Sequence, residues 1–264
     1  MSDSFFTTTD NQRFQPTSHT RGPWDENHCH AGPPTGLMAR AAEIQLPDQQ
    51  LVRLSINLQR PIPYSGFTVT AEVAKKGRMV SLCNSRLLDD DGKLCASAET
   101  LHVTRQPEFE VTTTRLDVPL PEDGRAGDFP INRTLHDLPS FTGDGVETRY
   151  APGSTPDPGP TTAWIRTVDL LPDETPSPFQ RMCPMADCGN AFSRNAEPWE
   201  INFMNPDLTI VMFREPQGEW MGSQSTGHWE TSGIGMADAQ LLDQHGVVGR
   251  AVQTLLLRPT DSMR

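Results

Sequence analysis

The sequence has no apolar run long enough to cross a bilayer, and its polar start at residues 1–4 lacks a secretory signal pattern. It also has no excess of basic residues, because 22 Lys and Arg against 34 Asp and Glu give a formal net charge of −12. That charge argues against a nucleic-acid or anionic-membrane partner, although a local arginine cluster could still bind phosphate groups. We therefore expect a cytoplasmic protein with neither nucleic acid nor membrane as its partner.

Cysteine is scarce and carries no recognisable pattern. The five cysteines are odd in number and have no metal-ligand spacing, so reduced thiols are expected. The tripeptide His28-Cys29-His30 suggests a metal, but no nearby residue completes a ligand set. The Ser-rich stretch at 222–227 does not fit the G-x-S-x-G pattern of serine hydrolases. The sequence thus predicts no metal, no cofactor and no serine nucleophile.

Proline and glycine, by contrast, are abundant. The chain has 24 prolines and 20 glycines among its 264 residues, and 35% of the residues are hydrophobic. So many turn-forming residues favour a β-rich architecture over a helical bundle. The length allows one large domain or two small ones.

An internal repeat favours two units. The segment LLDDDG at 87–92 recurs as LLDQHG at 241–246, and Arg60 recurs as Arg214, so the difference in position is 154 residues in both cases. At the same spacing, Leu54, Ile56, Thr100 and Leu101 recur as Leu208, Ile210, Thr254 and Leu255. A repeat of this length without gaps indicates two copies of one folding unit.

Each copy is predicted to contain one helix followed by long strands. In the first copy a helix follows the Gly- and Pro-rich segment at 30–36, and strands are expected at 51–60, 67–74, 79–88 and 93–104. In the second copy, short strands at 147–150 and 161–170 precede a helix at 177–193, where Pro184 should kink the helix or mark its start. Strands are then expected at 201–214, 220–228, 233–242 and 247–258.

These elements predict an α+β fold of the double hot-dog type. Two tandem units would each wrap a long antiparallel sheet around one central helix and could join their sheets edge to edge. We expect an N-terminal unit at 1–105, a connector rich in Pro, Asp, Gly and Thr at 106–125, and a C-terminal unit at 126–264.

Six short motifs in a fixed order carry a resemblance to a known family. They are HAGPP at 30–34, RPIP at 60–63, ADCGN at 186–190, NPDLT at 205–209, GEW at 218–220 and GRAVQ at 249–253. With these motifs nearly the whole chain resembles the acyl-CoA thioesterase II (TesB-like) family of double hot-dog proteins. The resemblance implies an enzyme of fatty acid metabolism that hydrolyses acyl-CoA thioesters to free fatty acid and CoA.

The resemblance also implies the catalytic residues. The family activates a water with an aspartate on the second helix, a Thr or Ser on the following strand, and a glutamine near the C-terminus. Asp187 and Gln253 match the first and the last of these. Asn205 falls at the strand position, where it places an amide instead of a hydroxyl, and Asp207 is the second choice for the base.

The residues alone leave alternatives to these roles. Asp187 lies in an apolar segment, so burial should raise its pKa and make it a stronger base. A structural aspartate bonded to backbone N–H groups is an equal alternative, and Gln253 could face solvent. The N–H groups of Gly32, Gly36 and Gly189 are candidate donors to the oxyanion that develops during thioester cleavage.

The repeat predicts one working site per chain. The offset of 154 residues pairs Asp187 with Pro33, Gln253 with Glu99, and Asn205 with Leu51. Only the second copy therefore carries an acid at the helix position.

Two other functions remain open from the sequence. A hot-dog hydratase or dehydratase would need an Asp/His pair, and no histidine stands near Asp187 along the chain. A non-catalytic acyl-CoA or acyl-chain binding protein is compatible with Asn205. Acyl chain length and branching, the choice between CoA and acyl carrier protein, and assembly into a homo-oligomer are not fixed by the sequence.

Overall fold

The computed structural model describes residues 4–114, 116–131 and 138–260. The helices are η1 (Ser18–Thr20), α1 (Gly32–Gln45), η2 (Pro121–Asp123), η3 (Phe141–Gly145), α2 (Pro178–Ala186) and α3 (Gly189–Phe192). The strands are β1 (Phe6–Thr8), β2 (Arg13–Pro16), β3 (Gln50–Leu58), β4 (Phe67–Lys75), β5 (Val80–Leu88), β6 (Leu94–Val103), β7 (Arg125–Gly127), β8 (Val146–Tyr150), β9 (Thr161–Thr167), β10 (Ile201–Met204), β11 (Asp207–Met212), β12 (Met221–Trp229), β13 (Ile234–Asp243) and β14 (Gly246–Pro259).

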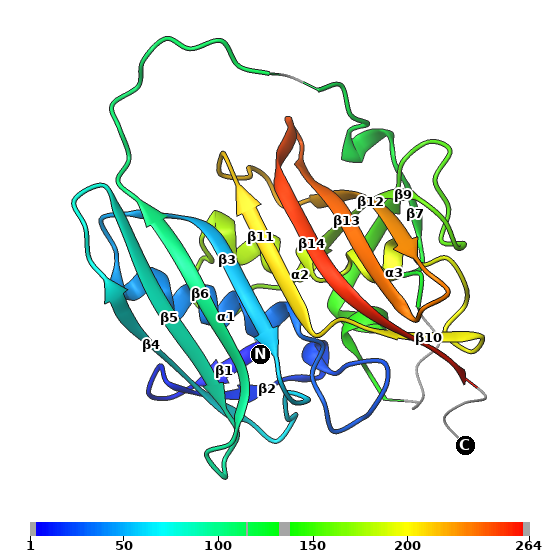
Figure 1. Ribbon diagram of the computed structural model, residues 1–264, viewed down its shortest axis with the longest axis horizontal. Helices are drawn as coiled ribbons and strands as arrows, with labels where there is room; N and C mark the ends of the chain where they lie inside the picture. Colours follow the sequence, from blue (N-terminus) through cyan, green and yellow to red (C-terminus); the bar gives the residue numbers. More distant parts are fainter. Residues whose placement is uncertain (1–3, 115, 132–137, 261–264) are drawn as a thin grey trace.

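The strands of the described residues form one 14-stranded sheet, in the order β1-β2-β4-β5-β6-β3-β11-β14-β13-β12-β9-β8-β7, with β10 paired to β14 (Figure 1). The four long strands predicted in each copy lie side by side in their own half of this sheet. The predicted strand at 201–214 is the exception, because it divides into β10 and β11 at Asn205 and Pro206.

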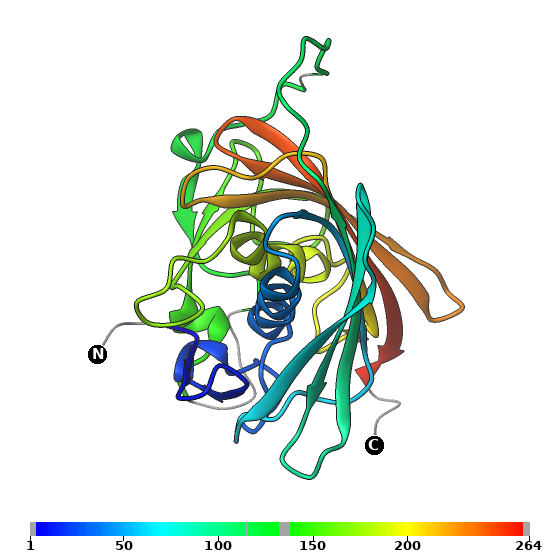
Figure 2. The same cartoon turned by 90° about the vertical axis from the view of Figure 1, so that its left-hand side faces the viewer.

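The sheet curves around the helices. In the side view the sheet wraps around α1, α2 and α3, which lie together within its concave side (Figure 2). Leu37 and Met38 of α1 and Met182 of α2 are almost fully buried, and they belong to one apolar core shared by both halves. The double hot-dog prediction is therefore confirmed.

The two halves join through β3 and β11, which pair antiparallel at the centre of the sheet. The pairing at this seam is reciprocal. Leu208, the counterpart of Leu54, pairs with Ile56, and Ile210, the counterpart of Ile56, pairs with Leu54. Ser55 and Thr209, 154 residues apart, face each other, and the Thr209 hydroxyl donates to Ser55 Oγ at 3.1 Å. A pseudo-two-fold axis thus passes between these two hydroxyls.

The repeat offset fails beyond the second hairpin of each half. Leu88 pairs with Leu94 across the first turn, whereas Leu242 pairs with Val247, so the second turn is one residue shorter. Consequently β14 is displaced by one residue relative to the repeat, and the matches of Thr100 with Thr254 and Leu101 with Leu255 are not structural.

This displacement changes the predicted counterpart of Gln253. Thr100 pairs with Cys83, and Gln253 pairs with Ala237, which is the counterpart of Cys83 at the 154-residue offset. The counterpart of Gln253 is therefore the buried Thr100. The prediction of Glu99, which is exposed, was wrong.

The helices do not follow the offset either. Pro33 is the second residue of α1, whereas Asp187 follows the last residue of α2, so the two residues lie at opposite ends of their helices. Pairing Asp187 with Pro33 was therefore wrong. The connection between helix and central strand is longer in the second half and shifts the helix against the repeat.

Candidate active site

The second central helix is interrupted at Asp187. α2 begins at Pro178, where the Ser177 side chain accepts the Gln180 N–H, and it ends at Ala186, with Asp187 as its C-cap. Pro184 lies inside α2, so it does not mark the helix start. A continuous helix would pair the Asp187 carbonyl with the Ala191 N–H. That N–H donates instead to Cys188 O at 3.1 Å.

Gln253 bridges this interruption from β14. Its Nε2 donates to the backbone oxygen of Asp187 at 3.1 Å and to Asp187 Oδ1 at 3.1 Å. Its Oε1 accepts the backbone N–H of Asn190 at 3.0 Å. One buried amide thus supplies the donor and the acceptor that the broken helix lacks. The solvent-facing alternative for Gln253 is thereby excluded, since its side chain is 1% exposed.

Asn205 lies in the gap between β10 and β11 and completes the contacts of the carboxylate. Its Nδ2 donates to Asp187 Oδ1 at 3.0 Å, and its Oδ1 accepts from Asn190 Nδ2 at 3.1 Å. Because an ionised carboxylate can only accept, the contact with Asp187 sets the Nδ2 end of the Asn205 amide toward it. The side chains of Asn205 and Gln253, far apart in sequence, therefore donate to the same carboxylate oxygen of Asp187.

The first half contributes a histidine that the sequence argument missed. His30 Nδ1 lies 3.3 Å from Asp187 Oδ2, and its ring stacks on Phe141 with centroids 4.1 Å apart. The expectation that no histidine stands near Asp187 was wrong, because α1 and α2 pack together and bring the start of α1 to the end of α2. The only signal in the sequence was the position of His30 immediately before a predicted helix.

Burial shifts the pKa values of this pair in opposite directions. Desolvation raises the pKa of Asp187 to about 7, although hydrogen bonds from Asn205, Gln253 and Gly32 act against it. Desolvation lowers the pKa of His30 to about 3. Near neutral pH the pair therefore consists of a neutral imidazole and a carboxyl group close to half ionisation. A general base poised near neutral pH has this property.

The proton between Asp187 and His30 has two arrangements. The Gly32 N–H lies 3.2 Å from His30 Nδ1, and it also acts on the Asp187 carboxyl. When Asp187 is protonated, its O–H can donate to His30 Nδ1. When Asp187 is ionised, His30 must carry its proton on Nδ1 to donate to Oδ2.

A cavity of about 590 Å³ opens onto these groups. Asp187, Asn190, Asn205 and His30 lie in its wall. The rest of the wall is mostly apolar and includes Leu58, Ile62, Phe129, Ile131, Ala191 and Phe203. The cavity can therefore hold an apolar chain directly beside the carboxyl group.

The three glycines considered as oxyanion donors lie outside the wall of this cavity. Gly36 is the fifth residue of α1, so its N–H is inside the helix, and the residue allows close packing on Leu170. The prediction for Gly36 was wrong for this reason. Gly189 makes room for Gln253, and Gly32 directs its N–H to His30 and Asp187.

Asp207, the second choice for the base, has a structural role in the sheet. Its Oδ1 accepts the backbone N–H of Thr254 at 2.7 Å, and it does not line the cavity. Asp187 is therefore the acid that the geometry favours.

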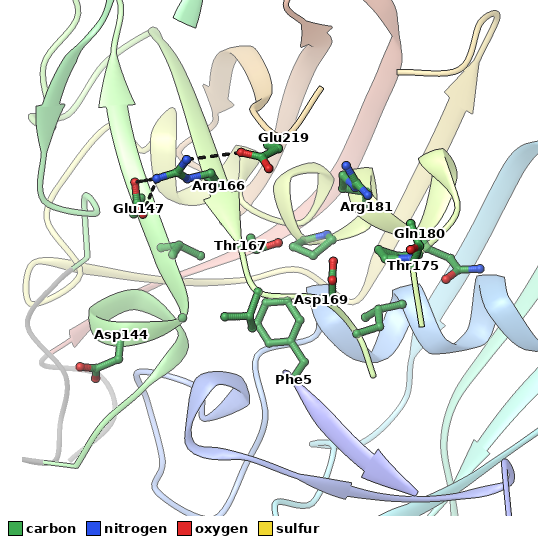
Figure 3. Close-up of a pocket in the computed structure, with 16 residues that line it drawn as sticks. Phe5, Asp144, Glu147, Arg166, Thr167, Asp169, Thr175, Gln180, Arg181 and Glu219 are labelled. Atoms are coloured by element: carbon green, nitrogen blue, oxygen red, sulfur yellow. Dashed lines mark hydrogen bonds and ion pairs between the residues drawn. The ribbon is translucent and has the colours of Figure 1, made fainter. Parts of the chain in front are cut away.

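A second cavity, of about 610 Å³, contains none of these groups (Figure 3). Its lining carries more acidic than basic residues, and Arg166 is held between Glu147 and Glu219. It contacts α2 through Gln180, Arg181 and Pro184, ahead of the helix break. Of these two cavities, the one at Asp187 is the candidate site, because its wall holds a buried carboxyl group that accepts from the side chains of Asn205 and Gln253.

The described part of the chain contains neither a cluster of metal ligands nor a membrane-spanning helix. No group of three or more His, Cys, Asp or Glu side chains in that part of the chain could hold a metal ion. Nor does any described helix have the length and apolarity needed to cross a membrane.

The fold and this site define a class: hot-dog proteins with a buried carboxyl group beside an apolar cavity. Residues 20–106 match the model of the acyl-CoA thioesterase N-terminal domain, and residues 118–257 match that of the acyl-CoA thioesterase C-terminal domain. The chain belongs to the acyl-CoA thioesterase family and is a thioester hydrolase.

Solved structures show the same fold at low sequence identity. A protein assigned as thioesterase II from Thermobifida fusca YX superposes with a TM-score of 0.72 at 14% identity, covering 96% of this chain and 95% of the other. The TesB protein of Mycobacterium avium subspecies paratuberculosis gives 0.67 at 14% identity, with 96% of each chain covered. Acyl-CoA thioesterase II TesB2 of Mycobacterium marinum gives 0.65 at 14% identity, covering 96% and 94%. No curated protein sequence matches the chain.

Proposed function

We propose that this protein hydrolyses acyl-CoA thioesters to a free fatty acid and CoA, with Asp187 as the general base. The observation that carries the proposal is the position of Asp187: a buried carboxyl with a pKa of about 7, in the wall of an apolar cavity. Fatty acid metabolism in the cytoplasm would be its setting, and assembly into a homo-oligomer is compatible with it.

The reaction needs one proton to be taken up and returned. Ionised Asp187 accepts a proton from a water held beside Asn205, and the water oxygen forms a bond to the thioester carbon. The resulting tetrahedral intermediate collapses by breaking its C–S bond, and the proton held on Asp187 passes to the departing sulfur. The net products are the carboxylic acid and free CoA thiol.

His30 supports both protonation states of the base. Each neutral tautomer of His30 suits one of these states: with its proton on Nδ1 the imidazole donates to ionised Asp187, and with its proton on Nε2 its Nδ1 accepts from the protonated acid. Stacking on Phe141 holds the plane of the ring, and in this orientation Nδ1 is directed at Asp187. His30 is thus a positioning residue in this mechanism.

The first test is thiol release from a panel of acyl-CoAs, from short to long, as a function of pH. Because the base must be ionised, kcat/KM should rise with pH and level off above about 7, the pKa of Asp187. A rate that does not change between pH 5 and 8 would contradict Asp187 as the base. No turnover at any chain length, with saturable acyl-CoA binding, would favour the non-catalytic binding protein.

The Asp187–His30 pair makes a hydratase the second candidate, because such an enzyme needs an Asp/His pair. The two residues come from different halves and lie 3.3 Å apart. Hydration of a trans-2-enoyl-CoA tests this candidate with the same protein. The reaction is measured as the loss of absorbance of the conjugated thioester. Hydration without thiol release would overturn the hydrolysis proposal.

A further inference from the structure

The cavity at Asp187 changes character from its buried end to its rim. Phe129 and Ile131 are 4% and 6% exposed, and Asp187 is 4% exposed. At the rim, Trp24 is 39% exposed, and the side chain of Arg60 is also exposed. A ligand with one apolar end and one charged end would enter with its charged end at the rim, since burying an unpaired charge is costly.

Arg60 is held at this rim with part of its guanidinium free. Its backbone N–H donates to Cys95 O at 3.1 Å, and its Nη1 donates to Leu94 O at 2.7 Å. In the described part of the chain no carboxylate comes within ion-pair distance of Arg60, although eight other arginines have such a partner. On a chain with a net charge of −12, an arginine without an acidic partner is available for an anionic ligand.

The other charged groups at the rim are engaged with each other. The Asp25 carboxylate accepts the Asn27 N–H at 2.8 Å and lies 3.5 Å from His28 Nδ1. Both Asp25 and His28 line the cavity, and their contact occupies the Nδ1 atom of His28. Arg60 is therefore the cation of the cavity wall that is free to meet a phosphate.

We propose that Arg60 binds the phosphate groups of CoA at the rim of the cavity, while the acyl chain extends toward Phe129 and Ile131. This inference rests on the proposed hydrolysis of acyl-CoA. Arg60 anchors the carrier and takes no part in the chemistry at Asp187. Its guanidinium can donate in parallel from Nε and Nη2 to phosphate oxygens, a geometry that a lysine does not reproduce.

The experiment compares two substrates with the same thioester. One is an acyl-CoA, and the other is the matching S-acyl-pantetheine, which lacks the phosphates and the adenosine. KM and kcat are measured for both with the wild type, Arg60→Ala, Arg60→Lys and Arg86→Ala. Arg86 is an exposed arginine on β5 that does not line the cavity, so it controls for loss of one positive charge.

Arg60→Ala should raise KM for the acyl-CoA by about tenfold or more, as expected for one lost charge-assisted contact, and leave kcat unchanged. KM for the S-acyl-pantetheine should not change, Arg60→Lys should be intermediate, and Arg86→Ala should match the wild type. Added salt should raise KM for the acyl-CoA more in the wild type than in Arg60→Ala.

Two results would overturn the phosphate role. An equal rise in KM for both substrates would mean that Arg60 shapes the rim through its contact with Leu94. No rise for either substrate would mean that the phosphates bind elsewhere. If the wild type hydrolyses neither substrate, the proposed function fails. Calorimetric titration with CoA and with pantetheine then decides whether Arg60→Ala weakens CoA alone.

Discussion

Each half of the chain has its own long strands and its own central helix, but the two halves differ where the helix meets the sheet. In the first half, the Thr100 hydroxyl donates to Cys83 O at 3.1 Å and bonds His102 at 2.9 Å, so its contacts stay within the sheet. In the second half, the corresponding Gln253 reaches out of the sheet and bonds the helix at Asp187 and Asn190. The same inward-facing position thus serves packing in one half and the site in the other.

The helices differ accordingly. α1 runs unbroken over 14 residues, and near its end Ala42 and Leu46 form an apolar cluster with Cys83. The second helix is divided into α2 and α3, and the break presents both the backbone oxygen and the carboxyl group of Asp187 to Gln253. The break in the helix of one copy thus supplies polar groups to the site, while the helix of the other copy stays intact and packs in an apolar cluster.

The acid at the helix break of the second half should have the largest effect when it is removed. Asp187→Asn keeps the shape and the contacts with Asn205 and Gln253 but cannot accept a proton from water. We expect kcat to fall by ~100-fold or more, the size of a general-base contribution. Thiol release under saturating acyl-CoA measures this loss.

The matched control for this variant is Asp207→Asn. Asp207 is an acid close in sequence to the site, and its carboxylate accepts from the sheet backbone at Thr254. Its replacement should leave kcat near the wild-type value. Similar losses in both variants would contradict the assignment of Asp187 as the base.

Replacing Gln253 by the residue of the first half is the second test of the comparison. In Gln253→Thr the shorter side chain leaves the Asn190 N–H and the Asp187 carbonyl without their partner. We expect kcat to fall by ~10–100-fold and the free energy of unfolding to fall by ~1–3 kcal/mol, the cost of unpaired buried polar groups. Kinetics and chemical denaturation measure the two effects.

Thr100→Val is the control for Gln253→Thr. It removes the hydroxyl at the equivalent position of the first half, so it should lower stability without changing kcat. A loss of activity in Thr100→Val would mean that the two positions are not functionally different.

The stability of the protein should depend on the charge of Asp187. Its pKa in the folded state, about 7, exceeds the usual value of 3.8, so folding favours the protonated form. The contribution is complete below about pH 4 and is lost as pH rises through about 7. At pH 9 the ionised carboxyl should cost ~1–4 kcal/mol. Asp187→Asn should therefore be more stable than the wild type at pH 9 but not at pH 4, as measured by urea denaturation.

The smallest expected effect concerns Asn205, where the TesB-like family has a hydroxyl. Asn205→Thr should retain a donor to Asp187 but lose the contact with Asn190, so we expect kcat to change by less than ~10-fold. Asn205→Leu removes the donor and should lower kcat further. Equal activity in Asn205→Leu and the wild type would show that no side-chain donor is needed there.

Much of the fold could be predicted because the alternation of apolar residues marks each long strand. The convergence of Asp187 and Gln253 was also predictable, but only through the resemblance to a family. The helix break at Asp187 could not be predicted, because it depends on contacts with a residue of β14, 66 positions later. His30 was missed for the same reason, since its contact with Asp187 arises from the packing of two helices.

On the last strand of each half, the repeat offset pairs the wrong residues. Identical letters continue beyond the hairpin at 241–246, although the shorter turn has already displaced β14 by one residue. Thr254 therefore has the same residue type as Thr100 at the repeat offset, whereas Gln253 occupies the equivalent position in the sheet. Counting identities cannot detect such a slip, whereas burial can, because Thr100 and Gln253 are both buried and Thr254 is exposed.

The seam between β3 and β11 also determines whether the two halves would stay associated after cleavage of the chain between them. His30 and Gly32 come from one half, and Asp187, Asn205 and Gln253 come from the other, so the site exists only while the halves are joined. The joining is done by strand pairing and a shared core, and in Figure 1 the segment after β6 arches away from the rest of the molecule. A protease nick in that arch would leave two fragments held together without a covalent link, and recovery of thiol release after mixing the separated fragments would report directly on their reassociation.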